Sequence, residues 1–188
     1  MNLYDFDNTI LKGDSSKRFF FYSLLRHPLI VLLSLFKTLV EVIKLVFKKS
    51  SFSKIKSTLF SYVKYISNLD DYMDKYASKN IHRVKNFYFD NQKDNDVIIS
   101  ASFEFIVKPF CDKLGIKNLI ATKYYTKNGK IIGVNCKGKE KVRRFYEIYP
   151  KDTVIEEAYS DSLSDIPMLE LAKKPYIVEK NIIKDYLK

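Results

Sequence analysis

Cysteine is scarce in this chain, with only Cys111 and Cys136 among its 188 residues. Two cysteines at this spacing form neither a disulfide framework nor a zinc site, so we expect both to be reduced thiols. A secretory signal is also missing from the first ten residues, which carry Asp5 and Asp7 and lack a basic leader. Both absences predict a cytoplasmic protein.

Glycine and proline are equally sparse, at five residues each, which argues against a disordered chain. Hydrophobic residues make up 46% of the sequence and aromatic residues 15%, enough for a substantial core. The length lies near the upper limit of what one core organises, so the chain is either one domain with a sizeable insertion or two small domains. We expect a compact globular enzyme.

Acidic residues are nearly absent between Lys17 and Lys56, where Glu41 stands against nine lysines and arginines. This local excess of +8 accounts for most of the net charge of +11. It indicates an anionic partner such as a membrane or a nucleic acid, or else a solvated basic face. Because no known nucleic-acid-binding motif accompanies the basic stretch, we expect no nucleic-acid partner.

The hydrophobic pattern divides the chain into a helical block and an alternating α/β part. A short strand leads into Asp5, and residues 19–89 have the helical period with breaks at 27–28, 50–51 and 68–71, which predicts roughly four helices. The later segments expected are strands at 97–100, 118–121, 153–159 and 176–178, a hairpin around Asn128-Gly129, and helices up to Leu114, after Gly138 and at 166–172. This order predicts an α/β fold: a Rossmann-like, doubly wound, mostly parallel sheet from residues 1–13 and 91–188, with 14–90 as an all-helical insertion.

The first strand ends in Asp5-Phe6-Asp7-Asn8-Thr9, which places two carboxylates at the carboxyl edge of the sheet, where α/β proteins bind ligands. Asp5 could attack phosphorus directly and form an aspartyl-phosphate. Asp7 could protonate the leaving oxygen and later deprotonate the attacking water. The same residue types are also ordinary turn formers at strand ends.

Two more acids, Asp161 and Asp165, follow the strand expected at 153–159. Magnesium prefers oxygen ligands and keeps several waters, so Asp161 fits a direct ligand and Asp165 a ligand that acts through water. Asp165 could instead cap the helix that follows it. Ser100 could donate a hydrogen bond to a phosphoryl oxygen or cap the next helix, and Lys141 could neutralise phosphoryl charge or simply face solvent.

Four segments in this order resemble the four motifs of the haloacid dehalogenase (HAD) superfamily. They are Asp5 to Thr9, Ile98-Ile99-Ser100-Ala101-Ser102, Gly138-Lys139-Glu140-Lys141, and residues 161–169. The chain is similar in particular to the phosphoserine-phosphatase-like branch, whose helical cap follows the first motif as residues 14–90 do here. The resemblance implies a Mg²⁺-dependent phosphatase, because the dehalogenase branch lacks the acid at Asp7.

The resemblance also implies roles for individual residues. Asp5, the backbone carbonyl of Asp7 and Asp161 would hold Mg²⁺, while Ser100, Lys141 and Thr9 would bind the phosphoryl group. Asp14 matches an acid that contacts the substrate amine in phosphoserine phosphatases, although it also suits a helix N-cap.

Two positions depart from the pattern of the family motifs. Ser160 replaces the usual glycine, which could crowd the loop that aims Asp161, and either Lys139 or Lys141 could fill the third motif, the spacing to Val142-Arg143-Arg144 favouring Lys141.

Residues 28–47 of the expected cap are strongly apolar, with Lys37, Glu41, Lys44 and Lys48 spaced to share one helical face. Such a helix could lie in the interface of an anionic membrane, pack within the cap, or form a homodimer interface. A weak likeness to C-type phosphatidylglycerophosphate phosphatases, which are membrane-associated, rests on this segment and His27-Pro28.

Three functions follow as alternatives: a phosphatase of a small molecule such as phosphoserine, a peripheral-membrane phosphatase of lipid phosphates, and a binding module that has kept the fold. The last is disfavoured because every catalytic acid is present.

Overall fold

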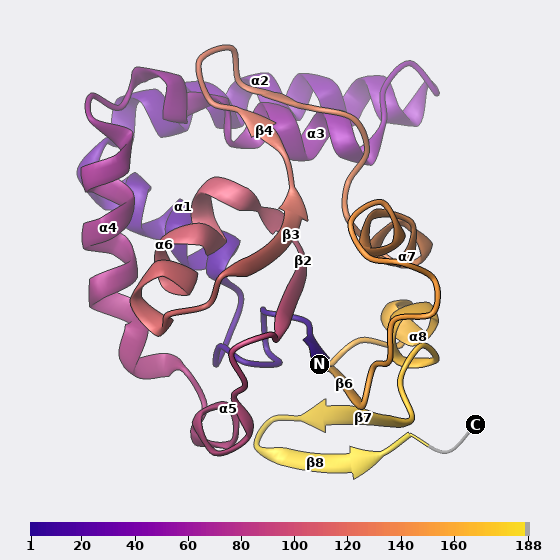
Figure 1. Ribbon diagram of the computed structural model, residues 1–188. Coiled ribbons are helices and arrows are strands. Elements are labelled where there is room, and N and C mark those ends of the chain that lie inside the picture. The colour runs from indigo at the N-terminus through magenta and orange to yellow at the C-terminus, as the bar shows by residue number, and fades with distance from the viewer. Residues whose placement is uncertain (187–188) are drawn as a thin grey trace.

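The computed structural model describes residues 1–186 and has a six-stranded sheet at its centre (Figure 1). The strand order is β3-β2-β1-β6-β7-β8, and every neighbouring pair is parallel except β7 with β8. The strands of this sheet are β1 Asn2–Tyr4, β2 Val97–Phe103, β3 Asn118–Thr122, β6 Glu157–Ser160, β7 Lys174–Glu179 and β8 Ile182–Asp185. The predicted mostly parallel α/β sheet is therefore confirmed.

The segment between β1 and β2 is helical. Its helices are α1 Ser15–Arg26, α2 Pro28–Val46, α3 Phe52–Leu59, α4 Leu69–Asn80 and α5 Asn86–Asn91, with short 3₁₀ helices at Ser61–Tyr65 and Ile81–Arg83. The predicted breaks have local causes: Pro28 starts α2, the Ser51 side chain caps α3 and the Asn68 side chain caps α4. Helices α2 and α3 lie together across one end of the molecule (Figure 1).

Helices cover both faces of the sheet. Helix α6 Glu104–Leu114 packs on β2 and β3 from the same side as α1 and α4, whereas α7 Lys139–Tyr146 and α8 Ile166–Leu169 lie on the opposite side (Figure 1). The alternation of side chains along the strands separates two cores. Tyr4 and Ile98 join the core shared with the helical segment, while Leu3, Val97 and Ile99 join the core beneath α7 and α8.

The helical segment shares a continuous core with the sheet. Phe19 of α1, Tyr76 of α4 and Phe110 of α6 belong to the same buried cluster as Tyr4 and Phe6. The rings of Phe6 and Phe110 lie 5.5 Å apart and those of Tyr76 and Phe110 5.8 Å apart. The division into a core of 1–13 and 91–188 and a cap of 14–90 stays our proposal, with the two parts closely packed. Cys111 and Cys136 are buried and unpaired, as expected.

Several element boundaries differ from those predicted. The strand expected at 153–159 starts later, at Glu157, and the helix expected at 166–172 ends at Leu169. Strand β2 runs past Ser100 to Phe103 through an irregularity in its pairing with β3. The antiparallel edge strand β8 was not predicted. The hairpin around Asn128-Gly129 was predicted correctly and consists of β4 Tyr124–Tyr125 and β5 Lys130–Ile131.

Candidate active site

The predicted motifs meet where three parallel strands end. Strand β1 pairs with β2 on one side and with β6 on the other, so the segments after Tyr4 and Ser160 and the end of β2 lie at one edge of the sheet. The Asp5 backbone N–H continues the pairing by donating to the Tyr159 carbonyl, at 2.9 Å. Asp5, Ser100 and Asp161 are therefore neighbours although they are far apart in the sequence.

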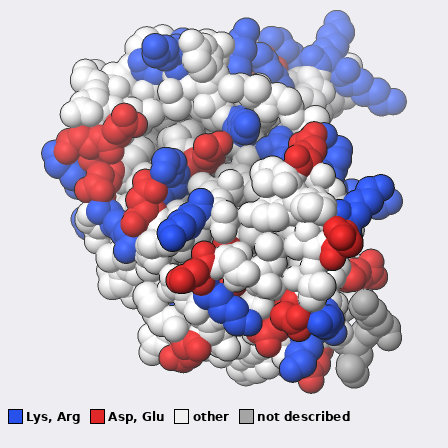
Figure 2. Space-filling model, viewed as in Figure 1, with Lys and Arg blue, Asp and Glu red and all other residues white. Residues whose placement is uncertain are grey.

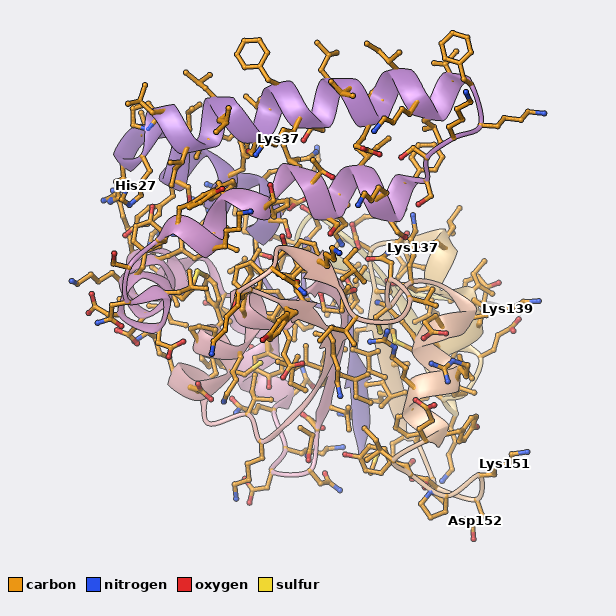
Figure 3. All side chains as sticks on the ribbon, turned by 90° about the horizontal axis from the view of Figure 1, so that it is seen from above. His27, Lys37, Lys137, Lys139, Lys151 and Asp152 are labelled. Carbon is orange, nitrogen blue, oxygen red and sulfur yellow. The ribbon has the colours of Figure 1, made fainter. Side chains whose placement is uncertain are left out.

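Lys141 forms a buried ion-pair cluster with two of the predicted acids. Its Nζ lies 2.6 Å from Asp5 Oδ1 and 2.7 Å from Asp165 Oδ2, and its side chain is inaccessible to solvent. Burial alone would lower the pKa of Lys141, but the charges and hydrogen bonds of Asp5 and Asp165 outweigh this effect. The pKa is therefore raised above its ordinary value, and the ammonium stays charged. Lys139, by contrast, is exposed and points away from the body of the molecule (Figure 3). The structure thus places Lys141, and not Lys139, against Asp5.

Thr9 brings the carboxylates of Asp5 and Asp161 together. The Thr9 hydroxyl donates to Asp5 Oδ2 at 3.1 Å and accepts the Asp161 backbone N–H at 2.9 Å, while Asp161 Oδ1 lies 3.5 Å from the same hydroxyl. Burial, followed by the charge of Asp5, raises the pKa of Asp161. A cation between these carboxylates would offset both the burial of the Asp161 charge and its repulsion by Asp5.

The donor set at this edge fits Mg²⁺. In residues 1–186 no group of three or more His, Cys, Asp or Glu side chains gathers closely enough to hold a metal alone. The expected set needs only the carboxylates of Asp5 and Asp161 and the backbone carbonyl of Asp7, because Mg²⁺ keeps several waters. Hard oxygen donors beside a phosphate site match this ion better than a transition metal.

Asp7 is held in place by hydrogen bonds to both of its carboxylate oxygens. The Ser15 backbone N–H donates to Oδ1 at 2.6 Å, and the Ser102 hydroxyl donates to Oδ2. Burial raises the pKa of Asp7 to about 6, although these hydrogen bonds oppose the shift. A carboxyl group with this pKa can exchange a proton near neutral pH, as a general acid and base must.

Ser100 and Asp14 line the same cavity as Asp5 and Asp7. Ser100 Oγ accepts the Ser102 backbone N–H at 3.0 Å, which leaves the hydroxyl able to donate, and it does not cap α6. Asp14 does cap α1, because its side chain accepts the Lys17 backbone N–H at 2.8 Å. Asp165 makes no capping hydrogen bond to α8, so this alternative to a site role is not supported.

Ser160 is linked to the site through Asp165. Its hydroxyl donates to Asp165 Oδ2 at 2.9 Å and accepts the Ser162 backbone N–H at 3.1 Å. Both bonds fix the loop that leads from β6 to Asp161 and Asp165. The Ser160 side chain is fully buried and hydrogen-bonded, and a shift of the Asp161 loop by this residue stays a prediction.

Lys56 is a site residue that the sequence analysis missed. It reaches from α3 into the cavity, where its Nζ donates to the Ala101 carbonyl at 2.7 Å and to Asn135 Oδ1 at 2.8 Å. Burial lowers its pKa to about 8, while Asp7 and Asp14 oppose the shift. Nothing in the local sequence distinguishes Lys56 from the other basic residues between 17 and 56. Its partners at Ala101 and Asn135 are brought near only by the fold.

The cavity has a volume of about 370 Å³ and is lined by acids and by Lys56 from α3. A larger cavity of about 680 Å³ lies between α4 and α6, but none of the predicted site residues lines it. We therefore place the candidate active site in the smaller cavity, where five acids meet Ser100 and Lys56; the acids are Asp5, Asp7, Asp14, Asp161 and Asp165.

Comparison with curated proteins gives partial matches. The chain is 40% identical to Protein CicA of Caulobacter vibrioides over 81 residues, which are 40% of this chain and 36% of that protein. It is 38% identical over 82 residues to a probable phosphatase of Mycobacterium tuberculosis, covering 39% of this chain and 28% of that one. The chain thus matches only about a third of these relatives' length.

Solved structures share the fold over most of the chain. A Bordetella pertussis protein of unknown function aligns with a TM-score of 0.66 at 17% identity, covering 93% of this chain and 87% of that one. A phosphoserine phosphohydrolase-like protein from Francisella tularensis aligns with a TM-score of 0.54, also at 17% identity, over 93% and 85% of the two chains. The sequence model of the haloacid dehalogenase-like hydrolases matches residues 3–170, which span the whole helical segment and all four predicted motifs. The chain therefore belongs to the haloacid dehalogenase-like hydrolase family.

Proposed function

We propose that this protein is a Mg²⁺-dependent phosphatase that hydrolyses a phosphate monoester through an aspartyl-phosphate on Asp5. The observation that carries the proposal is the fixed orientation of the Asp5 carboxylate, which Lys141 holds at Oδ1 and Thr9 at Oδ2. A nucleophile oriented beside a cavity needs little further ordering to attack. The name of the mycobacterial relative, a probable phosphatase, supports the same reaction class.

The reaction has two halves. In the first, an Asp5 oxygen attacks phosphorus while the bond to the leaving oxygen breaks, and that oxygen takes a proton from Asp7. In the second, Asp7 takes a proton from a water molecule, which attacks phosphorus, releases inorganic phosphate and restores the Asp5 carboxylate. The pKa of Asp7 of about 6 suits both proton transfers. Ser100 and Lys141 would bind the phosphoryl oxygens, on which negative charge accumulates.

We assign the metal to the carboxylates of Asp5 and Asp161 and the backbone carbonyl of Asp7, with Asp165 supporting it through water. When bound, Mg²⁺ would neutralise charge on the phosphoryl oxygens. Asp165 is almost fully buried and accepts hydrogen bonds from Lys141 and Ser160 at one oxygen, Oδ2. It therefore also positions Lys141 beside Asp5.

Two residues of the helical segment would bind the leaving group. Lys56 has the charge to bind an anionic group, and Asp14 the charge to bind an amine, and both line the cavity. Phosphoserine and related small metabolites carry both groups. The name of the Francisella structure, a phosphoserine phosphohydrolase-like protein, agrees with this substrate class. We place the enzyme in the cytoplasm, where its two unpaired cysteines would stay reduced.

A lipid phosphate is the second candidate substrate, and one observation favours it. The outer face of α2 is strongly apolar and exposed, as a protein that works at a membrane surface requires. Assays with Mg²⁺ on phosphoserine, sugar phosphates, nucleotides and phosphatidylglycerophosphate would separate the two. Hydrolysis of the lipid far above all soluble esters would favour the second candidate.

The mechanism is tested by the substitution Asp5→Asn. We expect it to lower Mg²⁺-dependent hydrolysis of an aryl phosphate on the order of 10⁴-fold or more, because the amide cannot act as the nucleophile. The matched control is Asp152→Asn, the same change at an exposed position (Figure 3). Mass spectrometry after acid quenching should find one phosphoryl group on Asp5 of the wild type. Activity close to that of the wild type in Asp5→Asn would overturn the proposal.

A further inference from the structure

Helix α2 has the reverse of the side-chain pattern expected for a helix on a soluble protein. Its buried stripe is formed by Val31, Ser34 and Thr38. Ser34 Oγ donates to the carbonyls of Val31 and Leu59, and Thr38 Oγ1 donates to the Ser34 carbonyl. These small side chains let α2 pack closely against α3.

The large apolar side chains of α2 face outward. The exposed set includes Leu29, Leu33, Phe36, Leu39, Ile43 and Val46. Phe36 is 68% exposed and Val46 is 76% exposed, so packing within the protein does not account for them. Figure 3 shows side chains without nitrogen or oxygen ends projecting from the outer side of α2, away from the rest of the molecule. A continuous apolar surface of this kind marks an interaction site.

Positive charge lines this apolar face. Lys37 and Lys44, which are seven residues apart, lie along one edge of the helix, and Lys48 follows just beyond its last residue, Val46. Glu41, the single acid of α2, is turned inward with 13% of its side chain exposed and pairs with Lys44 and Ser50. Figure 2 shows Lys and Arg gathered at the end of the molecule where α2 and α3 lie.

Two partners could cover this apolar face, a second copy of the chain or a lipid bilayer, and the charges along its edge favour the bilayer. A second copy of the chain would form a symmetric interface in which the same patch meets itself. Lys37 and Lys48 of the two copies would then approach one another, while the nearby acid, Glu41, is already paired with Lys44. An anionic bilayer accepts both features, because acyl chains receive the apolar side chains and headgroups receive the lysines. Within residues 1–186 no helix is long and hydrophobic enough to span the bilayer. Attachment at the surface is the geometry that remains.

We infer that the outer face of α2 docks on an anionic phospholipid bilayer, with Lys37, Lys44 and Lys48 at the headgroups. This inference does not depend on the reaction at Asp5. It has a consequence for access to the cavity: α3 packs directly against α2, and Lys56 of α3 lines the cavity. The docked protein would hold its active site one helix away from the lipid surface.

The absence of tryptophan from the chain permits a direct test. Phe36→Trp places the only tryptophan, which can be excited selectively at about 295 nm, at the centre of the face, where an exposed ring needs no repacking. With phosphatidylglycerol vesicles at low salt we expect its emission to shift to the blue and to be quenched by brominated lipid. The matched control is Ile148→Trp, at an exposed site beyond α7, which should show neither effect. An emission of Phe36→Trp that stays unchanged would overturn the inference.

Co-sedimentation separates the apolar and the electrostatic contributions. Replacing Lys37, Lys44 and Lys48 by Gln should lower partitioning into anionic vesicles on the order of 100-fold, and high salt should weaken binding of the wild type in the same direction. The control replaces the exposed Lys75, Lys108 and Lys184 by Gln, and should bind like the wild type. Equal losses in both triple variants would overturn the inference. So would a stable dimer in sedimentation velocity that Phe36→Gln dissociates, because a second copy would then cover this face.

Discussion

Lys56 reaches the cavity with two of its three N–H donors satisfied, by the Ala101 carbonyl and by Asn135 Oδ1. The third remains for a ligand. Its side chain also lies over the Phe103 ring, with Nζ 4.6 Å from the ring centre, so the ammonium is held from two sides. Because burial has lowered its pKa to about 8, the charge of Lys56 depends on pH in a range where the enzyme can be assayed.

We predict that the KM for a substrate with a second anionic group rises above pH 8. The lysine is charged below its pKa and neutral above it, so KM should increase about tenfold per pH unit once the pH exceeds 8. Lys56→Arg should keep KM low and flat over this range because the guanidinium stays charged. Lys54→Gln is the control, since Lys54 is exposed on the same helix. A wild-type KM that does not change between pH 7 and pH 9.5, measured by initial rates, would contradict the prediction.

The site residues that could be predicted have a local sequence signal, whereas those that were missed depend on contacts between distant parts of the chain. Asp5 and Asp161 could be predicted because each follows a strand directly, and Asp7 because it lies two residues after Asp5, so that the local pattern gives their place at the edge of an α/β sheet. Lys56 could not be predicted, because its partners are 45 and 79 residues away and it is one of nine lysines and arginines between residues 17 and 56. Ser102 was quoted within a motif but given no role. Its bond to Asp7 depends on the irregular end of β2.

At the scale of elements, the β4–β5 hairpin holds α3 in position over the cavity. The Ser57 hydroxyl of α3 donates to the Gly129 carbonyl at 3.0 Å and accepts the Ile131 backbone N–H at 3.2 Å, while the Tyr124 hydroxyl donates to the Ser57 carbonyl at 3.0 Å. Lys56 is the neighbour of Ser57. The hairpin therefore fixes the part of α3 that carries the Lys56 side chain.

We predict that Gly129→Ala destabilises the protein more than Gly115→Ala. Both glycines have φ of +70°, so an added Cβ costs about 1–2 kcal/mol at either position. At Gly129 the Cβ would also lie 3.1 Å from Ser61 Cβ and 3.2 Å from Ser61 Cα, whereas at Gly115 it would meet nothing within 4 Å. We expect the crowding to add about 1–3 kcal/mol to the loss of unfolding free energy. Urea denaturation measures both, and equal losses would show that Ser61 yields without cost.

Helix α2 shows why the position of an element along the chain could be predicted better than the face that it buries. Periodicity located the helix between Pro28 and Val46, because the helical repeat and the proline are local features. The sequence alone left open whether its apolar side faces inward, and the default for a soluble protein is burial. Ser34 and Thr38 are buried because they fit against α3, a tertiary contact that composition does not encode. Strand β8 was missed for a similar reason: its side chains are exposed along the sheet edge and carry no alternation.

At the scale of the whole molecule, the surface and the cavity differ in charge. The chain has a net charge of +11, yet its cavity gathers four acids around Asp5. A positive surface attracts anionic substrates and lipids from a distance. The acids that line the cavity would repel a phosphate at close range, an effect that Lys56 and Lys141 offset in part and a bound metal cation would offset further. The metal would therefore contribute to binding as well as to chemistry, and its loss should be visible in the stability of the folded protein.

We predict that Mg²⁺ raises the melting temperature of the wild type and not that of Asp161→Asn. A ligand that binds only the folded state at a hundredfold excess over its Kd contributes about 2.7 kcal/mol, which corresponds to about 5–10 °C for a protein of this length. Without metal, Asp161→Asn should melt at or above the temperature of the wild type, because the substitution removes repulsion between Asp161 and Asp5.

Asp14→Asn is the control, since it changes an acid of the same cavity that is not assigned as a metal ligand. It should keep the α1 cap, because an Asn side chain accepts the Lys17 backbone N–H as Asp does, and it should keep the full Mg²⁺ shift in differential scanning calorimetry. A full Mg²⁺ shift in Asp161→Asn would rule out this residue as the principal metal ligand.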